Sequence, residues 1–134
     1  MPTLRVAAVQ WQIRPAVRFA DFAAHAAAVV AEAATVGAEL LVLPEYLSYE
    51  LLASHPDAPR LTERRLEAAF ASVFPPALEA YLELFGELAA RHGFPVLAGS
   101  TWHALDGGVA NSAFLVMPGG DVRRQTKLHL TPPE

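Results

Sequence analysis

Hydrophobic residues follow two different spacings along the first third of the chain. Residues 4–9 form a short apolar run, which predicts a buried strand. Between residues 19 and 33, apolar side chains recur every three or four positions, as on one face of a helix, and Gly37 suits the end of that helix. Residues 40–43 are all apolar, as in a central strand covered on both faces. Pro44 has no N–H to donate and therefore ends that strand.

The middle of the chain has weaker periodicity and contains several prolines. Residues 46–61 predict a long loop, a feature that more often serves function in a compact domain. Residues 63–74 predict a short helix. The pair Pro75 and Pro76 is expected to end this helix and to begin a second one, which closes at Gly93.

Three strands are predicted after the second helix. Residues 94–101 form the first, and glycine-containing turns lead to residues 109–117 and then to residues 122–127. The last two strands are therefore expected to form a hairpin. Strands and helices that follow one another in this way predict a layered α/β fold in a single domain, residues 1–134.

Composition and charge restrict the classes of partner. Hydrophobic residues make up 53% of the chain and charged residues 18%, which excludes a disordered protein. The net charge is −4 with no block of like charges, so no surface for nucleic acid or for an anionic membrane is expected. The sequence has no visible signal peptide and no apolar stretch that could cross a bilayer, so we expect a soluble, cytoplasmic protein.

Glu45 and Lys127 stand where a site would be expected. Glu45 directly follows a buried strand, and the carboxyl ends of strands are where open α/β sheets bind ligands. Lys127 ends the last predicted strand, and we expect the two strands to be neighbours, so that both side chains converge. Each residue also has a simpler explanation. Glu45 would serve as a solvated loop residue or helix cap, and Lys127 as a charge that protects a sheet edge.

Four segments resemble, in the same order, motifs of the nitrilase or carbon–nitrogen hydrolase superfamily. They are residues 4–10, 37–45, 111–116 and 127–130. The first is similar to that family's first strand, the second to the segment with its general-base glutamate, and the last two to the strand and motif of its catalytic lysine. Each segment is weak alone, but together they cover the chain nearly end to end. We expect Asn111, at the start of the third segment, to satisfy backbone groups beside the site.

The resemblance implies roles for individual residues. Glu45 would take the proton of a thiol, and Lys127 would stabilise the anion that develops when the thiol attacks an amide or a nitrile. Glu134 matches a second glutamate of the family that helps to position the lysine and the substrate. Tyr46 and Trp102, aromatic residues near predicted loops, are further candidates for contact with a substrate.

The resemblance also implies a four-layer α-β-β-α sandwich, of which this chain would be the incomplete N-terminal part, with a mixed sheet and helices on one face. The family's nucleophilic cysteine lies after the lysine motif, and this sequence contains no cysteine. We therefore expect an amidase, nitrilase or N-carbamyl amide hydrolase fragment that is inactive alone and uses no cofactor or metal. Its uncovered sheet would favour a homo-oligomer or a complementary C-terminal polypeptide.

Two alternatives stay open on the sequence alone. A truncated or degenerate domain that is retained for binding or assembly would explain why there is no cysteine. A metal-dependent phosphoesterase with a similar sandwich would need several Asp, Asn or His ligands around a hard cation. The four aspartates, Asp21, Asp57, Asp106 and Asp121, instead lie on a predicted helix face or in turns, with no motif around them.

Overall fold

A five-stranded mixed sheet forms the centre of the molecule in the computed structural model, which describes residues 1–129. The strands lie side by side in chain order: β1 (Val6–Ala8), β2 (Leu40–Val42), β3 (Val96–Leu105), β4 (Gly108–Val116) and β5 (Val122–Thr126). The first three strands are parallel, and the last two are antiparallel to their neighbours. The predicted α/β class, the mixed sheet and the final hairpin are therefore confirmed.

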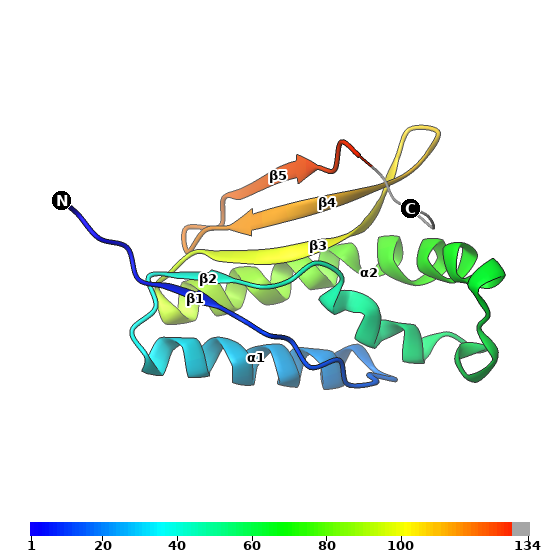
Figure 1. Cartoon of the computed structure of the whole chain (residues 1–134), viewed down its shortest axis with the longest axis horizontal. Coiled ribbons are helices and arrows are strands. Elements are labelled where there is room, and N and C mark those ends of the chain that lie inside the picture. Colours follow the sequence, from blue (N-terminus) through cyan, green and yellow to red (C-terminus); the bar gives the residue numbers. More distant parts are fainter. Residues whose placement is uncertain (130–134) are drawn as a thin grey trace.

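Two long helices, α1 (Phe19–Thr35) and α2 (Glu63–His92), lie on one side of the sheet (Figure 1). The prediction that Pro75 and Pro76 separate two helices is wrong, because α2 runs through both. A proline inside a helix costs about 3 kcal/mol. Phe74 before the pair and Tyr81 after it are both fully buried, so tertiary packing of the helix outweighs this local preference. No helix within residues 1–129 combines the length and the apolar character that a membrane span requires.

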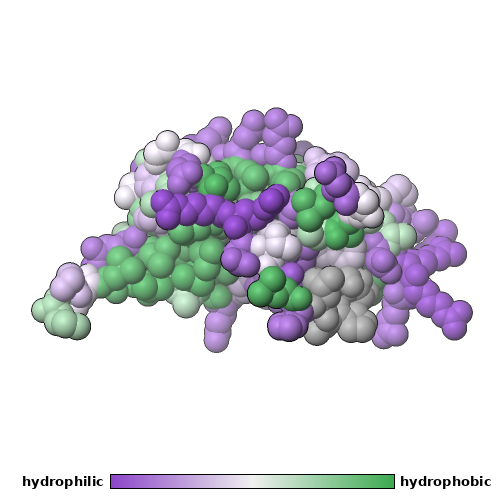
Figure 2. Space-filling view, turned by 90° about the horizontal axis from the view of Figure 1, so that it is seen from above, coloured by the Kyte–Doolittle hydropathy of each residue, from purple (hydrophilic) through white to green (hydrophobic). Residues whose placement is uncertain are grey.

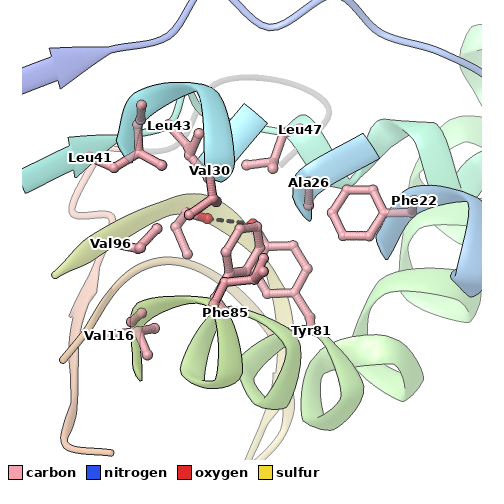
Figure 3. Close-up of a cluster of buried hydrophobic side chains, with 14 of the residues drawn as sticks. Phe22, Ala26, Val30, Leu41, Leu43, Leu47, Tyr81, Phe85, Val96 and Val116 are labelled. Atoms are coloured by element: carbon pink, nitrogen blue, oxygen red, sulfur yellow. Dashed lines mark hydrogen bonds between the residues drawn. The ribbon is translucent and has the colours of Figure 1, made fainter. Parts of the chain in front are cut away.

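The main core lies between the two helices and the sheet (Figure 3). Phe22 of α1 stacks on Tyr81 of α2, with ring centroids 5.7 Å apart. The Tyr81 hydroxyl donates a hydrogen bond to the carbonyl of Ala98 in β3, so a polar atom in the core is satisfied. Burial raises the pKa of Tyr81 well above its ordinary value. The helices thus fix β3, the strand from which the candidate site is built.

Within residues 1–129, no helix lies over the other face of the sheet (Figure 1). Side chains alternate between the two faces of a strand. Leu41 and Val96 belong to the core, whereas their neighbours Val42 and Leu97 are only partly buried. Figure 2, seen from above Figure 1, shows a broad apolar area on this side, crossed by a band of hydrophilic residues. The predicted arrangement, with helices on one face only, is confirmed.

Two local predictions need correction. Strand β1 is shorter than the predicted run and is not buried, since Val6 is 48% exposed, because it lies at the edge of the sheet and one of its faces is uncovered. The predicted loop at residues 46–61 contains two 3-10 helices, η1 (Leu47–Ser54) and η2 (Ala58–Arg60). Helix η1 begins two residues after Glu45, so its packing bears directly on the site.

Candidate functional site

The backbone of Glu45 is attached to the neighbouring strand. Glu45 forms an isolated parallel bridge with Ser100 of β3, and the amide of Tyr46 donates to the Ser100 carbonyl at 3.1 Å. One step earlier, the Leu43 amide donates to the Leu97 carbonyl at 2.9 Å. Pro44 therefore ends β2 as a regular strand, but the chain continues along β3 and carries Glu45 to the carboxyl end of the parallel part of the sheet.

A glycine in β3 allows this close approach. Gly99 lies where the β3–β4 register shifts, and its φ of +63° is in the left-handed region. A Cβ atom at this position would lie 2.1 Å from the Pro44 carbonyl oxygen and 2.5 Å from the Leu47 side chain. Only glycine avoids both the clash and the backbone strain. Gly99 therefore determines how near the Glu45 segment lies to β3.

Lys127 reaches Glu45 from the far edge of the sheet. Its backbone amide donates to the Asn111 carbonyl at 2.9 Å, which extends the β4–β5 pairing by one residue. Its Nζ donates to Glu45 Oε1 at 3.1 Å. The predicted convergence of these two side chains is confirmed. The expectation that their strands are neighbours is wrong, because β3 and β4 lie between β2 and β5. The length of the lysine side chain and the extension of the Glu45 segment along β3 close the gap.

The Glu45–Lys127 pair is only partly buried. The side chain of Glu45 is 47% exposed and that of Lys127 is 29% exposed. An ion pair with this exposure contributes about 0–1 kcal/mol to stability, so stability does not account for it. Both charged groups therefore remain partly accessible to solvent.

Asn111 joins the pair to the aromatic residues beside it. Its Nδ2 donates to Glu45 Oε1 at 3.0 Å and to the Tyr46 hydroxyl at 3.0 Å. Asn111 was expected only to satisfy backbone groups, whereas this nitrogen contacts two side chains of the candidate site. The sequence carried no clear signal for these contacts, because the predicted strand ended at residue 101, whereas in the structure Asn111 pairs with Trp102.

Tyr46 and Trp102 both lie at the site. Tyr46 has a left-handed backbone, with φ 59° and ψ 26°, a strained conformation for a non-glycine residue. Trp102 is 1% exposed, donates to the Tyr46 hydroxyl at 3.3 Å and packs edge-on against Phe70 of α2. The aromatic cluster also includes Tyr49 and Phe74. Contact of Tyr46 and Trp102 with a substrate stays a prediction.

The charge of Glu45 affects the pKa of Tyr49. Burial raises the pKa of the Tyr49 phenol above its ordinary value, and the negative charge of Glu45 raises it further. Both effects disfavour the phenolate. The Tyr49 side chain is therefore an uncharged phenol beside the site at neutral pH.

A hollow of about 180 Å³ adjoins Glu45 and is lined by Leu43, Leu97, Gly99, Ser100 and Ala113. It is smaller than the roughly 300–1,000 Å³ of typical ligand pockets. Two larger hollows, of about 400 Å³ and 580 Å³, are lined by neither Glu45 nor Lys127. Of these three hollows, the smallest is the one that Glu45 lines, and size without chemistry is weaker evidence of a site.

Two further expectations concern Glu134 and metal ions. Glu134 lies outside the described residues, so its proposed role is neither supported nor contradicted. Within residues 1–129, no group of three or more His, Asp or Glu side chains is arranged to hold a metal ion. The phosphoesterase alternative depends on such a group.

Comparison with known proteins assigns the fold. The family model described as carbon-nitrogen hydrolase matches residues 5–134. YhcX of Bacillus subtilis (strain 168), described as a probable hydrolase, is 26% identical over 132 residues, which are 98% of this chain and 24% of YhcX. The chain therefore spans about a quarter of this relative.

Solved structures with the same fold include two hydrolases. A carbon-nitrogen hydrolase from Helicobacter pylori G27 has a TM-score of 0.72 at 16% identity, over 96% of this chain and 41% of its own. An amidase from Nesterenkonia sp. has a TM-score of 0.68 at 20% identity, over 97% of this chain and 44% of its own. Mutant forms of that amidase carry acrylamide added to the active-site cysteine or hold butyramide.

Proposed function

Because the chain belongs to the carbon-nitrogen hydrolase family, we propose that it supplies Glu45 and Lys127 to a site that hydrolyses a small amide, nitrile or N-carbamyl compound. The observation that carries this proposal is the hydrogen bond between Lys127 Nζ and Glu45 Oε1 at the end of the parallel strands. The butyramide and acrylamide complexes of the Nesterenkonia amidase favour a small aliphatic amide over the other two substrate classes.

The two charged groups suit different parts of the reaction. A carboxylate can take the proton from a thiol as its sulfur attacks the carbon of the C–N bond. An ammonium group can stabilise the negative charge that then develops on the substrate oxygen or nitrogen. Because Glu45 and Lys127 also bind each other, the pair is oriented before a substrate arrives.

The thiol has to come from outside these 134 residues, because the sequence contains no cysteine. The chain by itself therefore lacks the covalent step, and we expect it to have no significant hydrolase activity. A polypeptide segment that carries the cysteine would lie against the uncovered side of the site, next to Ala113 and Glu45. A complementary polypeptide, or a longer form of this one, would have to provide it.

The aromatic residues have two proposed parts in substrate binding. The ring of Tyr46, which is half-buried beside Glu45, would contact the substrate directly. Trp102 is buried and would act by holding the Tyr46 hydroxyl in place. Glu134 keeps its expected role in positioning the lysine and the substrate.

The test is an assay of two polypeptides against acyl amides, nitriles and N-carbamyl compounds. One is the 134-residue chain, for which we expect no turnover. The other is the longest polypeptide that results when the natural gene is translated onward through the DNA that follows the codon for residue 134. We expect Glu45→Gln in that polypeptide to lower kcat at least about 100-fold, the lower range for loss of a general base.

Glu32→Gln is the matched control, because Glu32 is an exposed glutamate on α1 and does not line the hollow beside Glu45. Its turnover should equal that of the unchanged protein. Hydrolysis that survives Glu45→Gln at full rate would overturn the proposal.

The second candidate function is a domain used for binding or assembly without catalysis. The absence of cysteine favours it. It predicts that no polypeptide from this locus hydrolyses any of the three substrate classes, and that Glu45→Gln leaves partner binding unchanged.

A further inference from the structure

Asn111 is the only asparagine in the sequence, and its carboxamide lies between Glu45 and Tyr46. A carboxylate only accepts hydrogen bonds, so the amide nitrogen, and not the amide oxygen, has to face Glu45. The two hydrogens on Nδ2 are both used, one toward Glu45 Oε1 and the other toward the Tyr46 hydroxyl. This arrangement fixes the orientation of the amide about its last side-chain torsion.

The backbone that carries Asn111 is equally constrained. Asn111 is 2% exposed and lies inside β4, directly opposite Trp102 of β3. On the other side, its carbonyl accepts the hydrogen bond from the Lys127 amide. A side chain on a central strand with pairing on both sides has little freedom, and such an element holds functional groups more accurately than a loop does.

The two oxygens of the Glu45 carboxylate differ in their hydrogen bonds. Oε1 accepts from both Asn111 Nδ2 at 3.0 Å and Lys127 Nζ at 3.1 Å. Within residues 1–129, no donor contacts Oε2. The two donors therefore hold one oxygen and leave the other directed away from them.

We propose that Asn111 is a positioning residue that fixes Glu45 Oε1 and so makes Oε2 the oxygen that accepts the thiol proton. This inference rests on the proposed function. In the step, the S–H bond breaks, its proton bonds to Oε2, and the sulfur keeps the electron pair with which it attacks the substrate. Oε1 becomes the carbonyl oxygen of the neutral acid and still accepts from Asn111 and Lys127, so neither donor has to move.

Positioning matters here because the Glu45 side chain is 47% exposed and is not held by surrounding core residues. A flexible glutamate at the surface samples several rotamers. A displacement of about 1 Å in a reacting group can lower a rate by about 100-fold. Lys127 alone cannot prevent this, since its own side chain is long and partly exposed.

The test is NMR spectroscopy of the 134-residue, 14.4 kDa chain, in which labelled asparagine gives the signals of one residue only. We expect two separate side-chain amide proton signals for Asn111. At least one should move between neutral and acidic pH in the unchanged chain. In Glu45→Gln the signals should persist but no longer move with pH. Asn111 signals that are the same in Glu45→Gln and in the unchanged chain throughout the titration would overturn the proposal.

The second readout is the Glu45 side chain, whose three-bond couplings report its χ1 rotamer. We expect a single rotamer in the unchanged chain and averaged couplings in Asn111→Ala. Ser112→Ala is the matched control, because Ser112 is the next residue, is fully buried, and binds His103 and Thr126 instead of Glu45. Couplings that are equal in Asn111→Ala and Ser112→Ala would also overturn it. Neither readout needs turnover, so their failure is distinct from hydrolysis that survives Glu45→Gln, which overturns the proposed function.

Discussion

Tyr46 combines an unfavourable backbone conformation with a place next to Glu45. A left-handed non-glycine residue costs about 1–3 kcal/mol, and such residues gather at functional sites. Its amide binds the Ser100 carbonyl and its hydroxyl accepts from Asn111, so hydrogen bonds at both ends of the residue hold it. The left-handed conformation of Tyr46 turns the chain, within this single residue, from the extended Glu45 segment into η1.

Gly99→Ala should disrupt the Glu45 segment. The left-handed backbone costs about 1–2 kcal/mol for an alanine, and the clash with the Pro44 carbonyl adds to it. We expect the free energy of unfolding, measured by urea denaturation, to fall by at least about 2 kcal/mol. In the matched control Gly107→Ala, φ is +87° but no atom lies within 4 Å of the new Cβ, so only the backbone cost of about 1–2 kcal/mol applies, without a clash. Equal losses in both variants would contradict this account of Gly99.

The phenol of Tyr49 should report the charge of Glu45. Burial and Glu45 both raise the pKa of Tyr49, with burial the larger cause. We therefore expect Glu45→Gln to lower the pKa of Tyr49 while leaving it above the ordinary value of about 10. Labelled tyrosine ring carbons followed by NMR through an alkaline titration would measure it. Glu32→Gln, which removes a distant exposed charge, should leave the pKa unchanged, and a Tyr49 that ignores Glu45→Gln would contradict the stated geometry.

The raised pKa of Tyr49 also sets the sign of its effect on stability. The folded state keeps the phenol proton to higher pH than the unfolded state does. The contribution is therefore complete below the unfolded pKa of about 10 and is lost as pH rises toward the folded value. Tyr81, whose pKa is raised by complete burial, acts in the same direction.

At the scale of elements, η1 is held to its neighbours by a buried carboxylate of its own. Glu50 of η1 is 1% exposed. It accepts hydrogen bonds from the Trp11 indole at 2.8 Å and the Arg14 amide at 2.9 Å. Its oxygens also lie 2.8 and 3.1 Å from His25 Nδ1 of α1. This network fastens η1 to α1 and to the segment after β1, and so fixes the chain that leaves Glu45.

Glu50→Ala should detach η1 from its neighbours. The Trp11 indole and the Arg14 amide, whose hydrogen bonds to Glu50 are only partly buried, would lose their acceptor, at a combined cost of about 1–3 kcal/mol. We expect the free energy of unfolding to fall by about 2 kcal/mol, and amide hydrogen exchange in η1 to accelerate. The exposed Glu32→Ala on α1 should change stability by no more than about 0.5 kcal/mol. Slow exchange in η1 of Glu50→Ala would refute the anchoring role.

The whole molecule has helices on one face of its sheet and an apolar area on the other (Figures 1 and 2). Exposed apolar patches of this kind mark surfaces that associate with another polypeptide. The edge strand β5 is protected differently, since Arg123 and Arg124 place charges along it. Association is therefore expected through the face of the sheet and not through its edge.

The uncovered face should make the 134-residue chain self-associate or bind an apolar dye. We expect Val42→Glu, on that face, to reduce dye fluorescence and the mass measured by light scattering. Val36→Glu is the matched control, because Val36 is 62% exposed at the end of α1. A monomer that binds no dye would contradict the expectation that this face takes a partner.

The sequence by itself determined the strands that carry Glu45 and Lys127 and the family motifs around them, because buried strands and turns are encoded by local apolar runs and glycines. It could not determine that α2 continues through Pro75 and Pro76, since the buried aromatic side chains that outweigh the prolines come from packing against the sheet.

The tertiary structure alone decided how the site is assembled. The strands of Glu45 and Lys127 are separated by two others, and the approach depends on the φ of Gly99 and on the reach of one lysine. The hydrogen bonds of Asn111 likewise join residues far apart in the chain. Such contacts depend on three-dimensional distances between segments, and local sequence propensity does not determine those distances.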